Sequence, residues 1–308
     1  MSRIHEALIR AQQEKVQKPQ HGSEPLPNES TPRVDEALEG SPVAGPTVGV
    51  IDAEEGSGIL TLEVLEARCP PSTWSPAPGS MLFADPHDNT PGTEEFRSLR
   101  SRLYQIREKR PLQTLLVSSA IAGEGKTFVA ANLARAVVQQ RGRRVLLIDS
   151  DLRVSRMCTL LGASAAPGLS DYLLGEADMF SILQHGPQEG LFFIAGGKRV
   201  HNPVELIGCG RLKPLIQRLA PVFDWIILDS PPSVPVTDAS LLADLSDGVL
   251  MVVRAGETPY DIARKGCQPF VDKQLLGVIL NRVAPESSYR AYYYYSPEGN
   301  DTKSTKLG

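Results

Sequence analysis

The sequence predicts an α/β protein built on a doubly wound, mostly parallel β-sheet with helices on both faces. The main support is a series of short apolar runs that alternate with helical stretches, the pattern of strands joined by crossover helices. These runs lie near residues 114–119, 144–149, 191–195, 224–229, 247–253 and 276–281. A glycine-rich loop follows the first run, and acidic residues end two of the later ones, which supports the same fold.

Composition limits the kind of protein. The 308 residues give room for one sizeable α/β domain with appendages, and a net charge of −4 disfavours nucleic acid as the main partner. The four cysteines include no C-x-x-C pair, as expected of a reduced cytosolic protein without structural zinc or disulfides. No apolar run approaches the roughly 18 residues of a transmembrane helix, and the start does not resemble a signal peptide. We therefore expect a cytoplasmic protein.

The chain is expected to begin with a short amphipathic helix over residues 1–17. Apolar residues recur there at helical spacing, at Ile4, Ala7, Leu8 and Ala11. The mixed charges of the segment favour docking on a protein partner over binding to anionic lipid. A frayed helix without a role is the alternative.

The next segment, residues 18–89, is expected to be a largely disordered linker. It is rich in Pro, Gly, Ser and Glu and lacks long periodic runs. Residues 59–65 are the exception, because this apolar stretch could form a strand or a docking segment.

A helix is predicted to begin at Pro91, which suits the first helical position after Thr90. Apolar residues recur along it at helical spacing, at Phe96, Leu99, Leu103 and Ile106. Beside them runs an oblique charged stripe of Glu94, Arg97 and Arg100. From the residues alone, this stripe is an ordinary solvated face with an ion pair between residues three apart.

The segment from Ala120 to Thr127 reads A-I-A-G-E-G-K-T and predicts a phosphate-binding loop, with alanine in place of the usual first glycine. Glycines let the backbone curl so that its N–H groups point at phosphate oxygens, and the helix that follows adds its positive end. We expect Lys126 to reach the β and γ phosphates and Thr127 to ligate Mg²⁺. The predicted nucleotide contacts are Ala122, Gly123, Glu124, Gly125, Lys126, Thr127 and Phe128.

Three carboxylates are expected to converge on this loop. Asp149 and Asp151 follow one apolar run and Asp229 follows another, and the carboxyl ends of parallel strands share one edge of a sheet. Mg²⁺ takes oxygen ligands and usually only one or two carboxylates, so Thr127, Asp149 and Asp229 are its candidate ligands. Asp149 or Asp151 could orient and deprotonate an incoming hydroxyl. Taken singly, an aspartate at a strand end is often only a turn or a helix cap.

Asn281 follows the last apolar run. It is a candidate contact to the nucleotide base, with a simple turn asparagine as the alternative. The predicted catalytic residues are thus Lys126, Asp149, Asp151 and Asp229.

Five of the eight tyrosines lie near the end of the chain, as Tyr289 and the run Tyr292, Tyr293, Tyr294 and Tyr295. Four consecutive tyrosines cannot all face a core, so some must be exposed. An exposed phenol cluster joined to a nucleotide site suggests that these hydroxyls become phosphorylated. A sticky tail or contact strand is the alternative.

From about Thr93 to Tyr295 the chain resembles the bacterial tyrosine kinase family, P-loop autokinases of capsule and exopolysaccharide synthesis, in its cytoplasmic stand-alone form. The matching segments are residues 122–127, 148–153, 228–232, 235–239, 252–256 and 277–282, followed by the tyrosine cluster. Departures are small. Ala122 stands where the family commonly has proline, and Ser150 and Ser230 stand where it commonly has alanine or threonine.

The resemblance implies a P-loop tyrosine kinase domain over residues 90–285 and a tyrosine-cluster tail over residues 286–308. It implies ATP and Mg²⁺ as cofactors and autophosphorylation in trans. It also implies a ring homo-oligomer built through Glu94, Arg97 and Arg100. The implied partners are a membrane-bound polysaccharide co-polymerase that activates the kinase, and a tyrosine phosphatase. The kinase would then be recruited to the inner face of the plasma membrane.

Two other functions compete with a kinase. One is an ATPase switch like the partition ATPases, which carry a second lysine early in the loop; Ile121 stands at that place and cannot supply the charge. The other is an ATP-binding scaffold of a polysaccharide export complex, in which the tail tyrosines are contact residues only. The scaffold predicts nucleotide binding without phosphotyrosine.

Overall fold

The computed structural model describes residues 60–69, 71–77, 79, 90–272 and 275–283. The predicted helix over residues 1–17 and the tail tyrosines lie outside the described residues.

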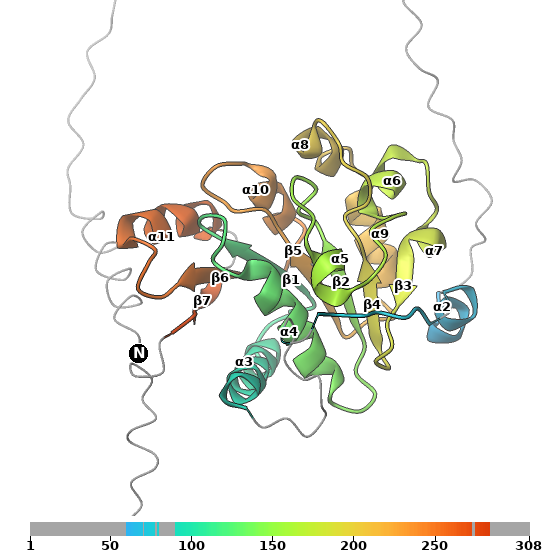
Figure 1. The fold of residues 1–308 in the computed structure, drawn as a ribbon, viewed down its shortest axis with the longest axis horizontal. Coiled ribbons are helices and arrows are strands. Elements are labelled where there is room, and N and C mark those ends of the chain that lie inside the picture. Colours follow the sequence, from blue (N-terminus) through green and yellow to red (C-terminus); the bar gives the residue numbers. More distant parts are fainter. Residues whose placement is uncertain (1–59, 70, 78, 80–89, 273–274, 284–308) are drawn as a thin grey trace, which may run out of the picture. The chain divides into compact units, whose positions relative to one another are not determined.

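The described residues form a seven-stranded sheet in the order β3-β4-β2-β5-β1-β6-β7 (Figure 1). Its strands are β1 (Thr114–Ser119), β2 (Val145–Asp149), β3 (Leu183–His185), β4 (Leu191–Ile194), β5 (Trp225–Asp229), β6 (Gly248–Arg254) and β7 (Leu275–Asn281). All neighbours are parallel except β3 and β4, which are antiparallel. The predicted doubly wound α/β fold is confirmed, and the six predicted runs all became strands. The short edge strand β3 was not predicted, because three residues are too few to show a periodic pattern.

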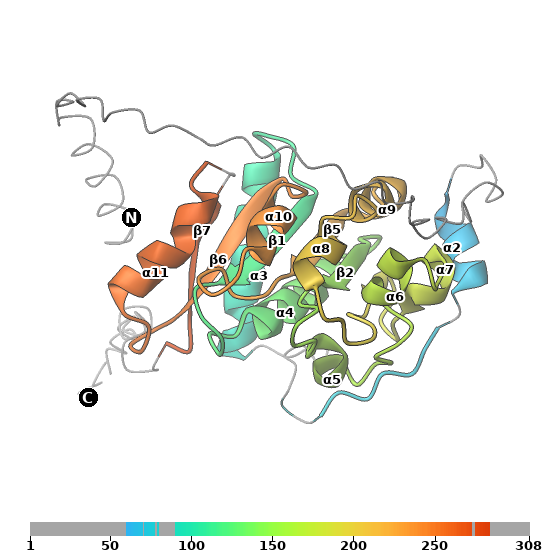
Figure 2. The same ribbon diagram turned by 90° about the horizontal axis from the view of Figure 1, so that it is seen from above.

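Helices cover both faces of the sheet (Figure 2). One face carries α3 (Pro91–Arg107), α4 (Lys126–Val138) and α5 (Met157–Leu161). The opposite face carries α2 (Leu62–Arg68), α6 (Leu169–Leu174), α7 (Met179–Ile182), α8 (Pro203–Ile207), α9 (Leu212–Leu219), α10 (Asp238–Ala243), α11 (Tyr260–Cys267) and the 3₁₀ helix η1 (Gln268–Phe270). Alternate residues of each strand enter the two cores; on β1, for example, Leu115 and Val117 face α4 while Leu116 faces away from it. Central strands are therefore buried on both faces, as continuous apolar runs require.

Helix α3 begins at Pro91, as predicted, with Thr90 as its N-cap residue. Its apolar residues, Leu103 among them, pack against α4. The charged stripe contains an ion pair between Glu94 and Arg97, while Arg100 donates to the carbonyl of Ala136 in α4.

Part of the expected linker, residues 60–69 and 71–77, is folded, and residues 66–69 and 71–77 lie outside the stretch expected to form a strand or a docking segment. That stretch contributes to helix α2 rather than to a strand, and it docks on its own domain through Leu65, which is fully buried, as the docking alternative expects. Thr61 accepts a hydrogen bond from the Val64 N–H at the helix start, which favours helix over strand. Leu65 and Cys69 are buried in the core. Their packing stabilises α2, because a helix this short is not stable through local propensity alone.

The strap, defined here as residues 60–69 and 71–77, passes around the β3–β4 edge of the sheet. Its α2 packs in the core on one face, and Trp74 packs edge-on against Phe193 on the other face. Between them Pro71 bridges to His185 in β3, and the Ser72 N–H donates to the His185 carbonyl. The strap thereby covers an edge strand that would otherwise expose unpaired backbone groups.

Among the described residues, no helix combines the length and the apolar character that crossing a bilayer requires.

Candidate functional site

The phosphate loop connects the buried strand β1 to α4, as the sequence predicts. Gly123 and Gly125 have φ values of 88° and 96°, a left-handed conformation that residues with a Cβ rarely adopt. At Gly125 an added Cβ would lie 2.1 Å from the Asn281 Nδ2 atom, so a side chain there would displace the Asn281 amide as well as strain the left-handed backbone. The loop therefore presents backbone N–H groups and the amino end of a 13-residue helix to the same space.

The charged residues of the site meet at the carboxyl edge of the sheet. Asp149 and Asp229 are register partners at the ends of β2 and β5. The Lys126 Nζ atom lies 2.9 Å from Oδ2 of Asp151 and 3.9 Å from Oδ1 of Asp229. The Thr127 hydroxyl donates to Oδ2 of Asp229 at 2.6 Å. The structure therefore brings these side chains together at one edge of the sheet, as predicted.

Burial shifts the pKa values of the charged groups in this cluster. Burial raises the pKa of Asp229 to about 7, although Lys126 opposes the rise. It also raises the pKa of Asp149 to about 6, against the hydrogen bond from Ser155. Burial alone would lower the pKa of Lys126, but Asp229 and Asp151 more than offset it, so that pKa lies above its ordinary value. Buried carboxylates thus outnumber the one ammonium beside them, and additional positive charge would be stabilised here.

Asp149 is occupied by its own loop. One oxygen accepts from the Ser155 hydroxyl at 2.6 Å and from the Met157 N–H at 3.2 Å, and the other accepts from the Asp151 N–H at 3.2 Å. These bonds hold the turn that places Asp151 beside Lys126. The metal and catalytic roles of Asp149 stay predictions, and the geometry assigns it the organisation of this turn.

Asp229 differs, because among the described residues its Oδ1 atom has no hydrogen-bond partner despite being buried. A buried carboxylate oxygen without a donor, next to a hydroxyl, suits a divalent cation with oxygen ligands. Thr127 and Asp229 would hold Mg²⁺ on this ground. The described residues contain no cluster of three or more His, Cys, Asp or Glu side chains that could form an all-protein metal cage.

The remaining predicted contacts are placed around the loop. Ala122 and Gly123 are exposed at its tip, and the Phe128 ring packs edge-on against Phe96 of α3. The Asn281 Nδ2 group donates to the Glu124 carbonyl at 2.8 Å. Its described role is therefore to hold the loop, and its contact with a base stays a prediction.

Two pairs of hydrogen-bonded residues that support the site were not predicted from the sequence. Ser155, which fixes Asp149, gave no signal because serine is common in any loop. Arg153 forms a two-bond pair with the buried Asp238, 85 residues away. Only the folded chain brings these two side chains together.

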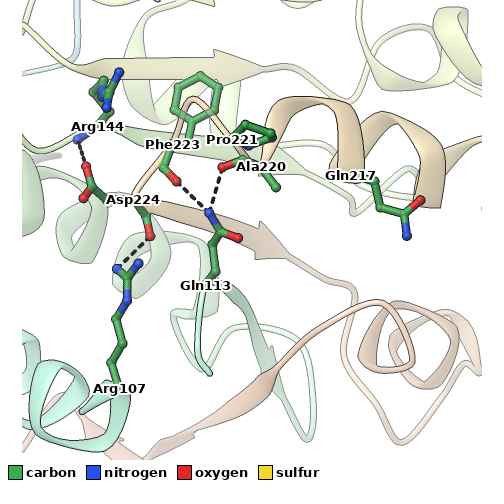
Figure 3. Close-up of a pocket in the computed structure, with 8 residues that line it drawn as sticks. All are labelled: Arg107, Gln113, Arg144, Gln217, Ala220, Pro221, Phe223 and Asp224. Carbon is green, nitrogen blue, oxygen red and sulfur yellow. Dashed lines mark hydrogen bonds between the residues drawn. The ribbon is translucent and has the colours of Figure 1, made fainter. Parts of the chain in front are cut away.

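A cavity of about 410 Å³ lies at the opposite, amino edge of the sheet (Figure 3). It is lined by Arg107, Gln113, Arg144, Gln217, Ala220, Pro221, Phe223 and Asp224. Several of its polar groups bond to the chain itself: Gln113 donates to two carbonyls of the segment before β5, and Arg107 donates to the Asp224 carbonyl. These bonds join β1 and α3 to that segment, which indicates a structural role.

The comparison with known proteins supports a nucleotide-binding site in this chain. Residues 115–295 match the family model of the CobQ/CobB/MinD/ParA nucleotide binding domain. Tyrosine-protein kinase YwqD of Bacillus subtilis is 32% identical over 210 residues, which are 68% of this chain and 88% of YwqD. The succinoglycan biosynthesis transport protein ExoP of Rhizobium meliloti is 32% identical over 194 residues, which are 61% of this chain but only 25% of ExoP. The solved kinase domain of the Escherichia coli tyrosine kinase ETK is 30% identical with a TM-score of 0.58, over 64% of this chain and 79% of that one.

The phosphate loop, the acidic strand ends and the matched family model define a nucleotide-binding P-loop protein of the CobQ/CobB/MinD/ParA class. Within that class, the extent of the similarity to YwqD and ETK is decisive. The chain belongs to the bacterial tyrosine-protein kinase family.

Proposed function

We propose that this protein is an ATP-dependent protein-tyrosine autokinase that phosphorylates its carboxyl-terminal tyrosine cluster in trans. The observation that carries the proposal is the set of Lys126, Thr127, Asp151 and Asp229 at one edge of the sheet. Family membership supports the same reaction.

Each residue has a role in the proposed reaction. The loop N–H groups and Lys126 would bind the phosphates, and Thr127 with Asp229 would hold Mg²⁺, which would neutralise charge on the phosphates. Asp151 receives the proton of the incoming phenol, whose pKa near 10 keeps it protonated until a base assists. A bond forms between the phenol oxygen and the γ-phosphorus as the bond from that phosphorus to the β–γ bridging oxygen breaks, and ADP leaves.

The wider setting is proposed from the relatives. ExoP is named a succinoglycan biosynthesis transport protein, and we propose that this kinase regulates exopolysaccharide polymerisation and export. A separate membrane-bound co-polymerase would activate it and recruit it from the cytoplasm to the membrane, and a phosphatase would reverse the modification.

Self-association is proposed to use the exposed end of the α3 stripe. Glu94 lies there with its side chain 57% exposed and paired to Arg97. Arg100 is instead tied to α4, so it would orient the helix rather than reach a neighbour.

The test is mass-spectrometric mapping of phosphotyrosine after phosphatase treatment and incubation with Mg-ATP. We expect phosphate on Tyr289 and Tyr292 to Tyr295 in the wild type and none in Lys126→Met. Lys198→Met is the matched control, because this lysine pairs with Glu176 at the surface. Nucleotide binding without phosphotyrosine, even with the cytosolic segment of a membrane partner added, would contradict the kinase and favour the scaffold.

A further inference from the structure

The phosphate loop contains a carboxylate that faces away from the phosphates. Glu124 is only 1% exposed, although it lies between the two glycines of the loop. A carboxylate aimed at the nucleotide would repel it. The role of the Glu124 side chain must therefore differ from phosphate binding, the role proposed for its neighbours in the loop.

Both oxygens of Glu124 accept hydrogen bonds. Oε2 accepts from the Ile121 N–H at 2.8 Å, which closes the loop upon itself. Oε1 accepts from the Thr258 hydroxyl at 2.7 Å and from the Arg254 N–H at 3.3 Å. Arg254 ends β6 and Thr258 lies in the turn before α11, so one side chain joins the loop to a segment some 130 residues away in sequence.

The backbone of the same residue is held from β7. The Asn281 side chain donates to the Glu124 carbonyl, and the Asn281 carbonyl accepts from the Ala255 N–H. Arg254 and Asn281 are register partners. The loop, the β6–α11 turn and the end of β7 thus form one hydrogen-bonded unit in which Glu124 is the central member.

Such a unit reduces the conformational freedom of the loop before any ligand arrives. The loop has two glycines in left-handed conformations, and glycine-rich segments have many alternatives to the binding geometry. A binding-competent state that is only partly populated weakens affinity by that fraction. Fixing the loop in advance therefore raises nucleotide affinity without any direct contact.

We propose that Glu124 is a positioning residue that preorganises the phosphate loop for nucleotide by anchoring it to Thr258 and the end of β6. This deepens the proposed function, and it rests on nucleotide binding at this loop but not on transfer to tyrosine. The turn before α11 becomes part of the nucleotide site through the Thr258 side chain, which contacts Glu124.

The experiment is calorimetric titration of the full chain with Mg-ADP. Glu124→Ala should weaken binding by about tenfold or more, because it leaves buried donors without an acceptor and frees the loop. Glu124→Gln keeps one acceptor oxygen for the Ile121 N–H, and its amide can donate to the Thr258 hydroxyl, but the Arg254 N–H loses its acceptor, so the loss should be smaller than in Glu124→Ala but measurable. Thr258→Val should give an intermediate loss.

The decisive readout is the double variant. If Glu124 acts through Thr258, Glu124→Ala with Thr258→Val should bind no more weakly than Glu124→Ala alone. Asp247→Ala is the control, because it removes another acceptor of two backbone N–H groups, at the far edge of the sheet, and should leave the ADP affinity unchanged.

Three outcomes would overturn the proposal: wild-type affinity in folded Glu124→Ala, full additivity with Thr258→Val, or equal weakening by Asp247→Ala. If Glu124→Ala does not fold, Thr258→Val decides: wild-type affinity would contradict the anchor, and weakened binding would support it. If the wild-type protein binds Mg-ADP but forms no phosphotyrosine, that result would count against the proposed kinase and not against the role of Glu124.

Discussion

The two edges of the sheet use the same residue type in opposite ways. At the amino edge, Asp247 accepts from two backbone N–H groups, those of Gln113 and Thr114. Asp224 there accepts from the Arg143 side chain. It also accepts from the Arg144 N–H (Figure 3). At the carboxyl edge, Asp229 is more deeply buried, has one oxygen without a hydrogen-bond partner among the described residues, and has a raised pKa.

The difference distinguishes the carboxylates of Asp247 and Asp224, which stabilise the fold, from that of Asp229, which has an oxygen open to a ligand. A satisfied carboxylate lowers the free energy of the folded state, whereas a buried one with an open oxygen raises it until a cation binds. The number of donors around each aspartate therefore predicts what its removal will do. The variants below test that rule, beginning with the largest expected effect.

Asp229→Asn should reduce tyrosine phosphorylation by about 100-fold or more, because it removes charge beside the transferred group. The rate of phosphotyrosine formation at saturating Mg-ATP measures this. A rate close to that of the wild type would show that the open oxygen is not used.

The same variant should stabilise the nucleotide-free protein at pH 8. The folded-state pKa of Asp229, about 7, lies above its ordinary value of 3.8. Its contribution to stability is therefore full below pH 3.8 and is lost as the pH rises through 7. The amide in Asp229→Asn does not titrate, so urea unfolding should show a gain of roughly 1–3 kcal/mol at pH 8 and a smaller one at pH 5. An equal gain at both pH values would contradict the assignment.

Asp247→Ala should have the opposite effect. It leaves two backbone donors at the start of β1 without their acceptor, and we expect a loss of about 1–3 kcal/mol of unfolding free energy. Mg-ADP affinity should not change, since the nucleotide site lies at the other edge. Thermal unfolding with and without Mg-ADP checks both points, and weakened binding would mean that the two edges are coupled.

The last comparison concerns two buried thiols, which lie outside the aspartate comparison. Burial raises the pKa of Cys267 in α11 and of Cys69 beside α2 to about 11 each. At pH 8 both should react with iodoacetamide at least about 100-fold more slowly than the exposed Cys209.

Mg-ADP should slow the labelling of Cys267 further and leave that of Cys69 unchanged, because α11 packs against Ala120 at the start of the phosphate loop. Peptide mapping over time gives both rates. Equal protection of the two thiols by nucleotide would indicate global rather than local stabilisation.

Most of the fold was predictable because its signals are local. The apolar runs at residues 115–117 of β1, 145–148 of β2 and 225–228 of β5 are continuous, because these parts of the strands are buried on both faces. The helix at Pro91 also followed from local spacing. The strap did not, because α2 is a short helix stabilised by Leu65 and Cys69 against a distant surface, and local composition there resembles a linker.

The sequence by itself determined the α/β class, the phosphate loop and the identity of the acidic residues that reach it, because each rests on neighbouring residues or on the shared edge of parallel strands. Only the tertiary structure decided which aspartate is satisfied and which is open. It also decided that Glu124 turns away from the phosphates to Thr258. Hydrogen bonds between residues far apart in the chain set these roles, and sequence spacing carries no record of where a buried side chain finds its donors.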